Sequence, residues 1–396
     1  MRKIIILIFV SGQLIFAAPE WSFDEAYDDN MLYLHALINY QFDQRWYDRW
    51  EANLFTGNGF LLSVGSVTVD DLLIDGHLVI NHDLGSGWRF QGDGRWLETR
   101  HLNTRTKDTF MGLEKLLGNN FGLFLNVNPF YDKEDTDIRT GVAIYSDTKQ
   151  NYFRLALKID DFVYDEKNEF GAVTNQQPVG LEWYGRYRYG SWTIFSTGVL
   201  GTGFERVFPD RNKSPELIGF GQKIDRAEIK LYYTPADEWF IGSGISLYRF
   251  NESKTFTDPV DSYTYWNSLT DYFIEINYDL SGEHRLRNLS HVVRQSADSH
   301  GYRAHDYERT DLMTGFFYRW QTGRQSIEGG YMFAITDWSY TNLHGRNDRH
   351  DNRYLDKLKL GWYYIFPSAD ILNISISHQV SIGGFGGANL QYIMLF

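Results

Sequence analysis

The sequence predicts an all-β protein whose strands close into a transmembrane antiparallel barrel. Three observations predict this fold: apolar and polar residues alternate along much of the chain, aromatic residues make up 17% of it, and apolar runs beyond the first segment are too short for membrane-spanning helices. Alternate side chains of a strand point to opposite faces. Each alternating segment therefore predicts a strand with one apolar and one polar face.

The amino-terminal segment has the order of a secretory signal peptide. Arg2 and Lys3 precede an apolar run over residues 4–16, and small residues follow at Ala17 and Ala18. Such a run is too short to span a bilayer comfortably. A retained anchor is the alternative, because a large residue, Ile15 or Phe16, stands at the outer position of the expected cleavage site.

The chain is expected to hold one folded domain after this segment. Residues 1–18 are assigned to the signal peptide, 19–30 to a short periplasmic segment and 31–396 to a single barrel domain, since the sequence contains no internal repeat, linker or low-complexity tract.

Composition excludes several kinds of site. The chain has no cysteine, which rules out disulfides, thiolate metal sites and a lipid anchor on cysteine. The net charge of −13 disfavours non-specific nucleic-acid binding. The abundant aromatic residues fit the rings that gather at membrane interfaces.

Residues 152–160 illustrate the alternation. Phe153, Leu155, Leu157 and Ile159 share one face, and the intervening residues Arg154, Ala156, Lys158 and Asp160 share the other. The pattern recurs in segments 138–144, 181–188, 228–233, 272–279 and 357–364. Strands of about 10 residues cross a bilayer when tilted.

The expected connections alternate between short and long. Short turns are expected near Gly190, Ala236, Gly282, Gly323 and Ser368. Long loops are expected over residues 162–178, 202–224, 251–270, 295–310 and 337–353. Barrels of this kind have short periplasmic turns and long extracellular loops, so we expect about 18 strands, within a range of 16 to 20. Residues 31–42 alternate well, whereas residues 60–69 do not.

The final strand adds a resemblance to this architecture. Leu390, Tyr392, Met394 and Phe396 fall on one face of the last eight residues. This resembles the carboxyl-terminal strand of bacterial outer-membrane β-barrel proteins, which ends on an aromatic residue. The resemblance implies that these four residues form the signal recognised by the barrel-assembly machinery, that the location is the outer membrane of a Gram-negative cell, and that membrane lipid surrounds the protein.

The polar faces of the strands predict a charged, porin-like interior. Eleven predicted pore-lining residues are basic and seven are acidic. They are Arg89, Asp93, Arg95, Arg139, Arg154, Lys158, Asp160, Glu182, Arg186, Arg188, Glu228, Lys230, Glu275, Asp279, Arg319, Glu328, Lys357 and Lys359. A net basic wall favours transport of an anionic or saccharide-type solute, including export of a polysaccharide. The plainer alternative is that these charges pair across strands and solvate the interior.

Two further functional readings are open. The first is a non-conducting structural or adhesion barrel, with a lumen plugged by loops such as 202–224. The second is a barrel hydrolase, for which Ser290-His291 and Ser377-His378 are candidates. Neighbouring residues of a strand point to opposite faces, so neither pair favours catalysis. We expect no catalytic residue and no cofactor.

Histidine and aspartate in two expected outer loops are weak candidates for a divalent metal site. His300 and His305, with Asp298 and Asp306, fall in one loop. His344 and His350, with Asp348 and Asp351, fall in the next. Imidazole and carboxylate together can bind a transition metal, but solvated loops use the same residues.

Overall fold

The structure is a computed structural model that describes residues 58–68, 72–99, 105–128, 137–147, 151–159, 173–174, 179–209, 217–256, 262–301, 305–342, 349–381 and 383–395. The described residues form one antiparallel sheet with 18 strands in a closed ring, and a two-residue strand, β8 (Val173–Thr174), pairs beside β10. No helix in the described part of the chain is long and apolar enough to cross a membrane.

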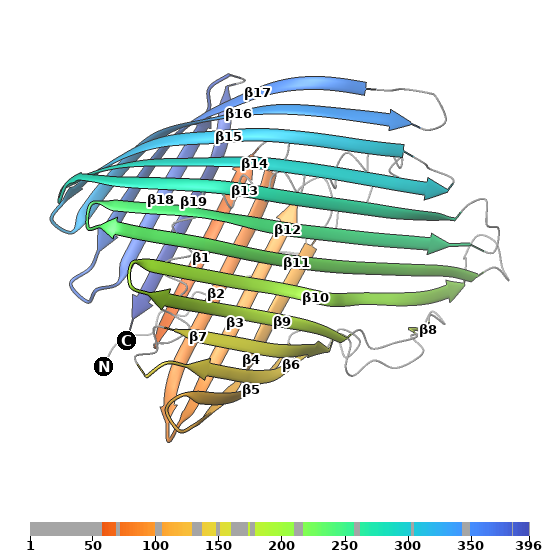
Figure 1. Ribbon diagram of the computed structural model, residues 1–396, viewed down its shortest axis with the longest axis horizontal. Coiled ribbons are helices and arrows are strands. Elements are labelled where there is room, and N and C mark those ends of the chain that lie inside the picture. The colour runs from red at the N-terminus through yellow and green to blue at the C-terminus, as the bar shows by residue number, and fades with distance from the viewer. Residues whose placement is uncertain are drawn as a thin grey trace.

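The strands follow one another around the ring in chain order (Figure 1). They are β1 (Gly59–Thr68), β2 (Leu72–Gly85), β3 (Trp88–Thr99), β4 (Arg105–Leu117), β5 (Phe121–Val127), β6 (Ile138–Tyr145), β7 (Tyr152–Ile159), β9 (Val179–Tyr189), β10 (Trp192–Pro209), β11 (Leu217–Ala236), β12 (Trp239–Thr255), β13 (Tyr263–Ser281), β14 (His284–Gly301), β15 (His305–Thr322), β16 (Gln325–Asn342), β17 (Arg349–Ile365), β18 (Ile371–Gln379) and β19 (Gly384–Leu395).

The first and last strands close the ring. β1 pairs antiparallel with β19, and Gly59 lies opposite Leu395. β1 also pairs with β2 on its other edge. The prediction of an all-β, closed antiparallel barrel of 18 strands is therefore confirmed.

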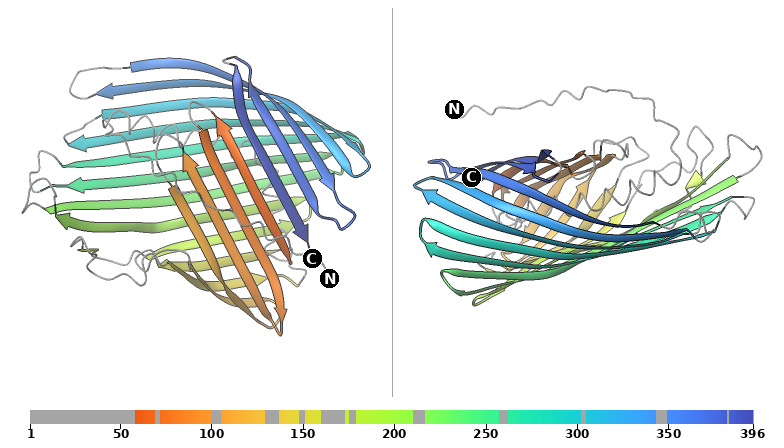
Figure 2. Two further views of the ribbon diagram at one scale, coloured as in Figure 1. Left: turned by 180° about the vertical axis from the view of Figure 1, so that it is seen from behind. Right: turned by 90° about the horizontal axis from the view of Figure 1, so that it is seen from above.

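The strands differ in length on the two sides of the barrel. β10 to β17, which we call the long wall, have 17 to 20 residues each. The remaining ring strands, the short wall, have 7 to 14. Figure 1 shows the long wall in front, and Figure 2 shows the short wall from behind.

One end of the barrel, the turn end, carries short connections. Four of them have two residues each and join β9 to β10, β11 to β12, β13 to β14 and β15 to β16. They are Gly190–Ser191, Asp237–Glu238, Gly282–Glu283 and Gly323–Arg324. The other end, the loop end, has the connections that the sequence predicts to be long. The predicted alternation between short and long connections does not hold throughout, because residues 366–370 at the turn end are a longer connection than residues 302–304 or 380–383 at the loop end. The assignment of the two ends to periplasm and exterior remains a prediction.

The predicted extents of four long loops are wrong. Strand pairing continues through most of residues 202–224, 251–270, 295–310 and 337–353. For example, β14 and β15 are separated by residues 302–304 alone. Polar residues occupy both faces of these strand extensions, so the alternation of apolar residues does not reveal them. Backbone ladder bonds extend the strands regardless of that pattern.

The outward face of the long wall is apolar near the turn end. Ile274 and Leu358 are 54% and 53% exposed, whereas inward-facing Glu275 is 5% exposed. Large apolar side chains exposed across neighbouring strands form a belt that suits hydrocarbon. Outward aromatic residues gather at the turn end of both walls: Trp88, Tyr187, Tyr189, Trp192, Tyr233, Trp239, Tyr278, Tyr318, Trp320, Trp362 and Tyr364.

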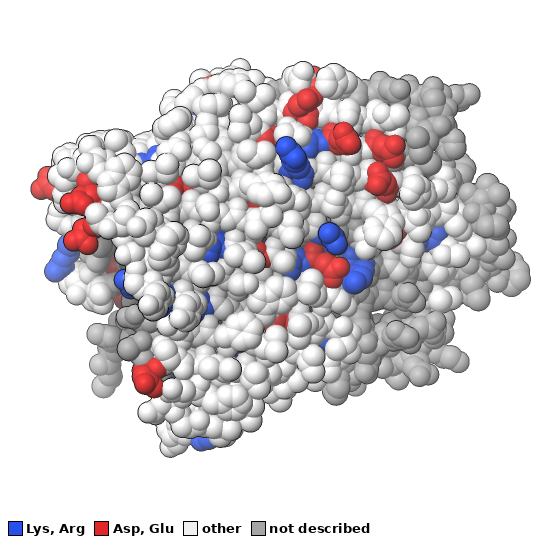
Figure 3. Space-filling view, viewed as in Figure 1, with Lys and Arg blue, Asp and Glu red and all other residues white. Residues whose placement is uncertain are grey.

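Polar residues replace the belt toward the loop end. Arg294, Glu308 and Asp337 occupy outward positions there. On β17 the change comes at Asp356, which accepts hydrogen bonds from the Tyr331 hydroxyl at 2.8 Å and from the Ser381 backbone N–H at 2.7 Å. Figure 3 shows charged side chains gathered at the turn end and over the loop-side part of this face. The long wall therefore extends beyond the apolar belt.

Residues 59–68 form strand β1 although their sequence does not alternate clearly. The reason is that Leu61 faces inward, where it is fully buried against Val79 and Ile393. The well-alternating segment 31–42 and the predicted signal peptide lie outside the described residues, so those expectations remain predictions.

Candidate functional site

The inward face of the barrel is the candidate site, and strand register decides which side chains share it. Glu275 faces inward on β13 and lies opposite Gly242 and Leu289 on its neighbours. The same register brings inward the predicted residues whose side chains are described. They are Arg89, Asp93, Arg139, Arg154, Lys158, Glu182, Arg186, Arg188, Glu228, Lys230, Glu275, Asp279, Arg319, Glu328, Lys357 and Lys359.

Two further members of the predicted set are Arg95 and Asp160. Arg95 is on β3, where its backbone pairs with His77 and Asp108. Asp160 lies outside the described residues. Whether this face lines an open passage remains a prediction.

Inward arginines stack on inward aromatic rings around the barrel. Six arginines of the described part have the guanidinium carbon 3.4 to 5.7 Å from a ring centroid. The pairs are Arg89 on Tyr145, Arg139 on Phe110, Arg154 on Phe124, Arg186 on Phe195, Arg287 on Phe317 and Arg319 on Tyr363. The ring face attracts the cation and fixes its position without neutralising its charge.

A buried hydrogen-bond network links inward residues of the short wall. Glu114, which is fully buried, accepts hydrogen bonds from Gln91 Nε2 and the Tyr145 hydroxyl, both at 2.6 Å. Arg154 Nη2 donates to Gln91 Oε1 at 2.6 Å. Arg89 Nη1 lies 3.8 Å from Glu114 Oε2. The network holds two predicted arginines through a glutamate that the sequence reasoning missed.

Arg139 joins carboxylates from two strands. Its Nε lies 2.9 Å from Glu182 Oε2, and its Nη1 lies 3.8 Å from Asp93 Oδ2. Lys158 lies 3.8 Å from Asp137. Cross-strand pairing of charges, the plainer alternative from the sequence, is therefore real for part of the predicted set.

A second ionic network lies on the long wall near the turn end. Glu328 Oε1 is 3.2 Å from Arg287 Nη2, and Glu328 Oε2 is 2.9 Å from Arg319 Nη2. The Tyr363 hydroxyl donates to Glu328 Oε1 at 3.4 Å. Two guanidinium groups thus share one buried carboxylate, which leaves a basic excess.

Several inward charged residues were missed by the sequence reasoning. Arg309 Nε lies 2.9 Å from Asp311 Oδ2, and His291 Nδ1 lies 2.7 Å from Asp271 Oδ1. Arg285 pairs with Asp279 through two contacts. Polar residues stand at many second positions of these strands, which is the pattern that could have predicted them. Apolar residues on the same face interrupt that pattern.

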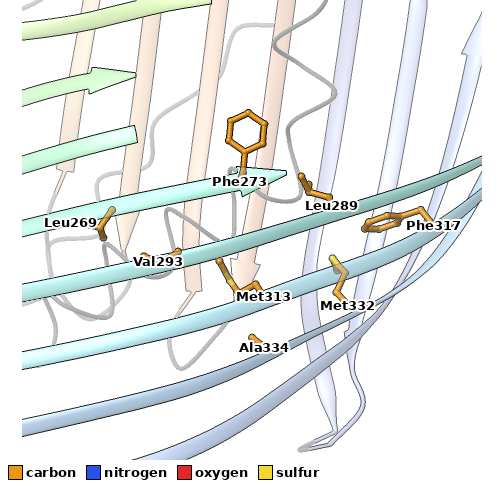
Figure 4. Packing of buried hydrophobic residues seen from close by; sticks show 8 residues of the cluster. All are labelled: Leu269, Phe273, Leu289, Val293, Met313, Phe317, Met332 and Ala334. Carbon is orange, nitrogen blue, oxygen red and sulfur yellow. The ribbon is translucent and has the colours of Figure 1, made fainter. Parts of the chain in front are cut away.

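The apolar residues that face inward on the long wall form a cluster (Figure 4). Its buried members are Leu269, Phe273, Leu289, Val293, Met313, Phe317, Met332 and Ala334. The Phe317 ring packs against Gly330, where an added Cβ would be 2.1 Å from the ring. Because the Arg287 guanidinium covers this ring at 4.2 Å, a charged group lies above the apolar one. The inward face therefore mixes charged and apolar areas.

Arginine-lined recesses lie at the turn end. One has a volume of 220 Å³ and is lined by Arg186 and Arg188 of β9, with Phe195, Tyr232 and Phe240 among its other residues. No acidic side chain lines it. A second recess lies among β14 to β19 and also has no acidic lining residue. This end of the described barrel consequently has guanidinium groups lining both recesses.

The Ser-His pairs considered for hydrolysis point to opposite faces. His291 is buried on the inward face, whereas the Ser290 hydroxyl is 2.7 Å from the Thr314 hydroxyl on the outward face. Ser377 is buried inward and His378 is exposed outward. A nucleophile and its base need direct hydrogen-bond contact, which neither pair makes. The expectation that the chain is not an enzyme remains a prediction.

The weak metal candidates are not brought together where they are described. His300 is on β14 and His350 on β17, with two strands between them, which separates them by at least roughly 14 Å at the usual strand spacing. Both are on strands rather than in loops. Among the described residues no group of three histidine, aspartate or glutamate side chains could hold a metal ion. The side chain of His305 and all of His344 lie outside the description.

The last strand places Leu390, Tyr392 and Met394 on the outward face. The Tyr392 hydroxyl donates to Asp370 Oδ2 at 3.1 Å near the turn end. Phe396 lies outside the described residues, and the assembly role of these positions remains a prediction.

Comparison with known proteins finds likeness in fold. No protein-family model matches the chain, and no curated protein is detectably similar in sequence. Among solved structures, a bacterial polysaccharide outer membrane secretin has a TM-score of 0.41 and 11% identity, covering 86% of this chain and 99% of its own.

Two further solved structures are similar to this chain in fold. OccAB2 of Acinetobacter baumannii has a TM-score of 0.39 and 10% identity, covering 85% of this chain and 96% of its own. OccK2 (OpdF) of Pseudomonas aeruginosa, in complex with glucuronate, has a TM-score of 0.38 and 10% identity, and the match also covers 85% of this chain and 96% of that one. These neighbours are outer-membrane β-barrel proteins. At such low identities the likeness extends to the barrel fold alone.

Proposed function

We propose that this chain is an outer-membrane channel for anionic or saccharide-type solutes. The observation that carries the proposal is the set of six inward arginines, each stacked on an aromatic ring, on strands from β3 to β15. Four of these arginines lie beside carboxylates, but two of the four share Glu328, so positive charge remains in excess there. Excess fixed positive charge in a lumen favours anions over cations. Guanidinium groups also hydrogen-bond carboxylate and phosphate oxygens.

The outward face supports placement in a membrane. A belt of exposed apolar side chains ends in aromatic residues at the turn end and in polar residues toward the loop end. In this proposal the signal peptide directs export, the turn end faces the periplasm and the loop end faces outward. Export of a polysaccharide through the lumen is one form of the same proposal.

Ion selectivity tests the proposal directly. The folded full-length protein would be inserted into a planar bilayer under a potassium chloride gradient, and the reversal potential measured. We expect conductance with a chloride preference, and sugar uptake in liposome swelling. A preference for potassium would overturn the anionic solute class, and absence of conductance would overturn the channel.

A non-conducting structural or adhesion barrel is the second candidate. It is favoured by the inward apolar cluster on β13 to β16, since buried apolar side chains do not suit a water-filled passage. The specific plug considered from the sequence, residues 202–224, is wrong in its described parts because these belong to β10 and β11. Liposomes that fail to swell in small sugars would favour this candidate.

A further inference from the structure

A recess at the turn end combines guanidinium groups with an apolar floor. It lies among β14 to β19 and has a volume of 180 Å³. Arg285, Arg319 and Arg324 contribute its basic side, and no acidic side chain lines it. Its composition therefore matches a negatively charged ligand.

Carboxylates behind the recess hold two of these arginines. Arg319 Nη2 lies 2.9 Å from Glu328, and Arg285 contacts Asp279. Neither acid belongs to the lining. Arg324, at the β15–β16 turn, has no acidic partner among the described residues. Two anchored guanidinium groups and one more exposed at the rim leave the recess with a basic excess.

The opposite side of the recess is apolar. Ile365, Ile371 and Ile393 line it together with Tyr363. The amides of Asn373 and Gln391, which also line it, bond to each other at 3.0 Å. Gln321, Gln325 and Ser326 complete the lining. A solute with hydroxyl groups on every side would still place some of them against the isoleucine side chains, and desolvating hydroxyl groups without new hydrogen bonds is unfavourable. The apolar floor instead suits a compact hydrocarbon body.

We propose that this recess binds a small monocarboxylate with a compact apolar body, such as an aromatic acid. The carboxylate would contact the arginines and the body would cover the isoleucines. A cavity of about 150 Å³ accommodates benzene, so a 180 Å³ recess accommodates a ring with one carboxylate. The proposal rests on the proposed function in one respect, namely that the ligand is a solute reaching the turn end of the channel.

Equilibrium dialysis of radiolabelled benzoate against the folded full-length protein in detergent tests the site. Empty micelles give the background. We expect saturable binding of one benzoate per chain, with benzyl alcohol, glucuronate and inorganic phosphate each competing at least about tenfold more weakly. Absence of saturable binding, or equal competition by glucuronate or phosphate, would overturn the proposal.

Two variants at exposed positions test the basic side and the apolar side of the recess separately. Arg324→Gln should weaken benzoate binding about tenfold, since it removes a charge-assisted contact. Ile365→Ser should weaken it several-fold through lost apolar contact. Lys254→Gln is the matched control, because it removes one inward positive charge near the loop end, where Lys254 lies 5.0 Å from Phe256. An Arg324→Gln affinity equal to that of the control would also overturn the proposal.

Binding and conduction are measured separately. Benzoate binding in detergent does not require an open lumen. A protein that binds benzoate without conducting would refute the proposed channel and retain the site. A protein that conducts without binding benzoate would refute the site and retain the channel.

Discussion

Arg319 and Glu328 lie opposite each other on β15 and β16, and their side chains meet on the inward face with Nη2 2.9 Å from Oε2. Both side chains are buried, and the same carboxylate also contacts Arg287 on β14. Three neighbouring strands are therefore joined through one acid, so this carboxylate should influence both stability and lumen charge.

Glu328→Gln should reduce the free energy of unfolding by about 3 kcal/mol, because it removes the carboxylate shared by two buried guanidinium groups. Urea unfolding in lipid vesicles, followed by tryptophan fluorescence, would measure the change. Glu308→Gln, at an exposed outward position on β15, is the control and should change stability by less than about 0.5 kcal/mol. Equal effects of the two substitutions would contradict the structural role of Glu328.

Gly330→Ala should destabilise the barrel by about 1 to 3 kcal/mol. The added Cβ would lie 2.1 Å from Phe317, and the ring would have to leave its place under Arg287. The neighbouring Gly329→Ala is a matched control because its Cβ would meet nothing within 4 Å. The same unfolding assay compares them, and the packing described for Phe317 is wrong if Gly329→Ala proves as destabilising.

Leu358→Arg should destabilise the protein in a bilayer by about 2 to 4 kcal/mol, because an outward charge would enter the hydrocarbon. Asn352→Arg, on the outward face of the same strand but nearer the loop end, should cost at most about 1 kcal/mol. Unfolding in vesicles measures both variants. Similar values would show that the apolar belt does not set the membrane position.

Arg186→Gln should move the reversal potential toward zero in a salt gradient, since it removes a positive charge from the turn-end recess that also contains Arg188. Lys223→Gln is the control, because Lys223 is exposed on the outward face of β11. Planar-bilayer recordings compare the two variants. An unchanged potential for Arg186→Gln would remove this recess from the selectivity pathway.

The alternation of side chains predicted the fold class, the strand number and the inward residues well. In β13 the residues from Ile274 to Asp279 alternate between outward apolar and inward polar positions, and the structure has that arrangement. Strand ends were harder to predict. Residues such as Arg294 and Asp298 are polar on an outward face that stands beyond the apolar belt, so hydropathy does not separate them from a loop.

The inward placement of the residues was predicted from the alternation, but the contacts between them were not. Arg139 and Phe110 are almost 30 positions apart, and their stacking depends on the register of β4, β5 and β6. Glu114 was missed because it lies in a segment with apolar residues on both faces. A single sequence provides no direct information on such cross-strand contacts.

The pairing of Gly59 with Leu395 has a kinetic consequence. These residues are separated by most of the polypeptide, so the contact carries the loop-closure entropy of a very long segment. A topology dominated by such distant pairings has a high contact order and assembles slowly. Until the final strand arrives, β1 and β18 each retain an unsatisfied edge, and a chain shortened before Gly384 would keep both edges available for aggregation.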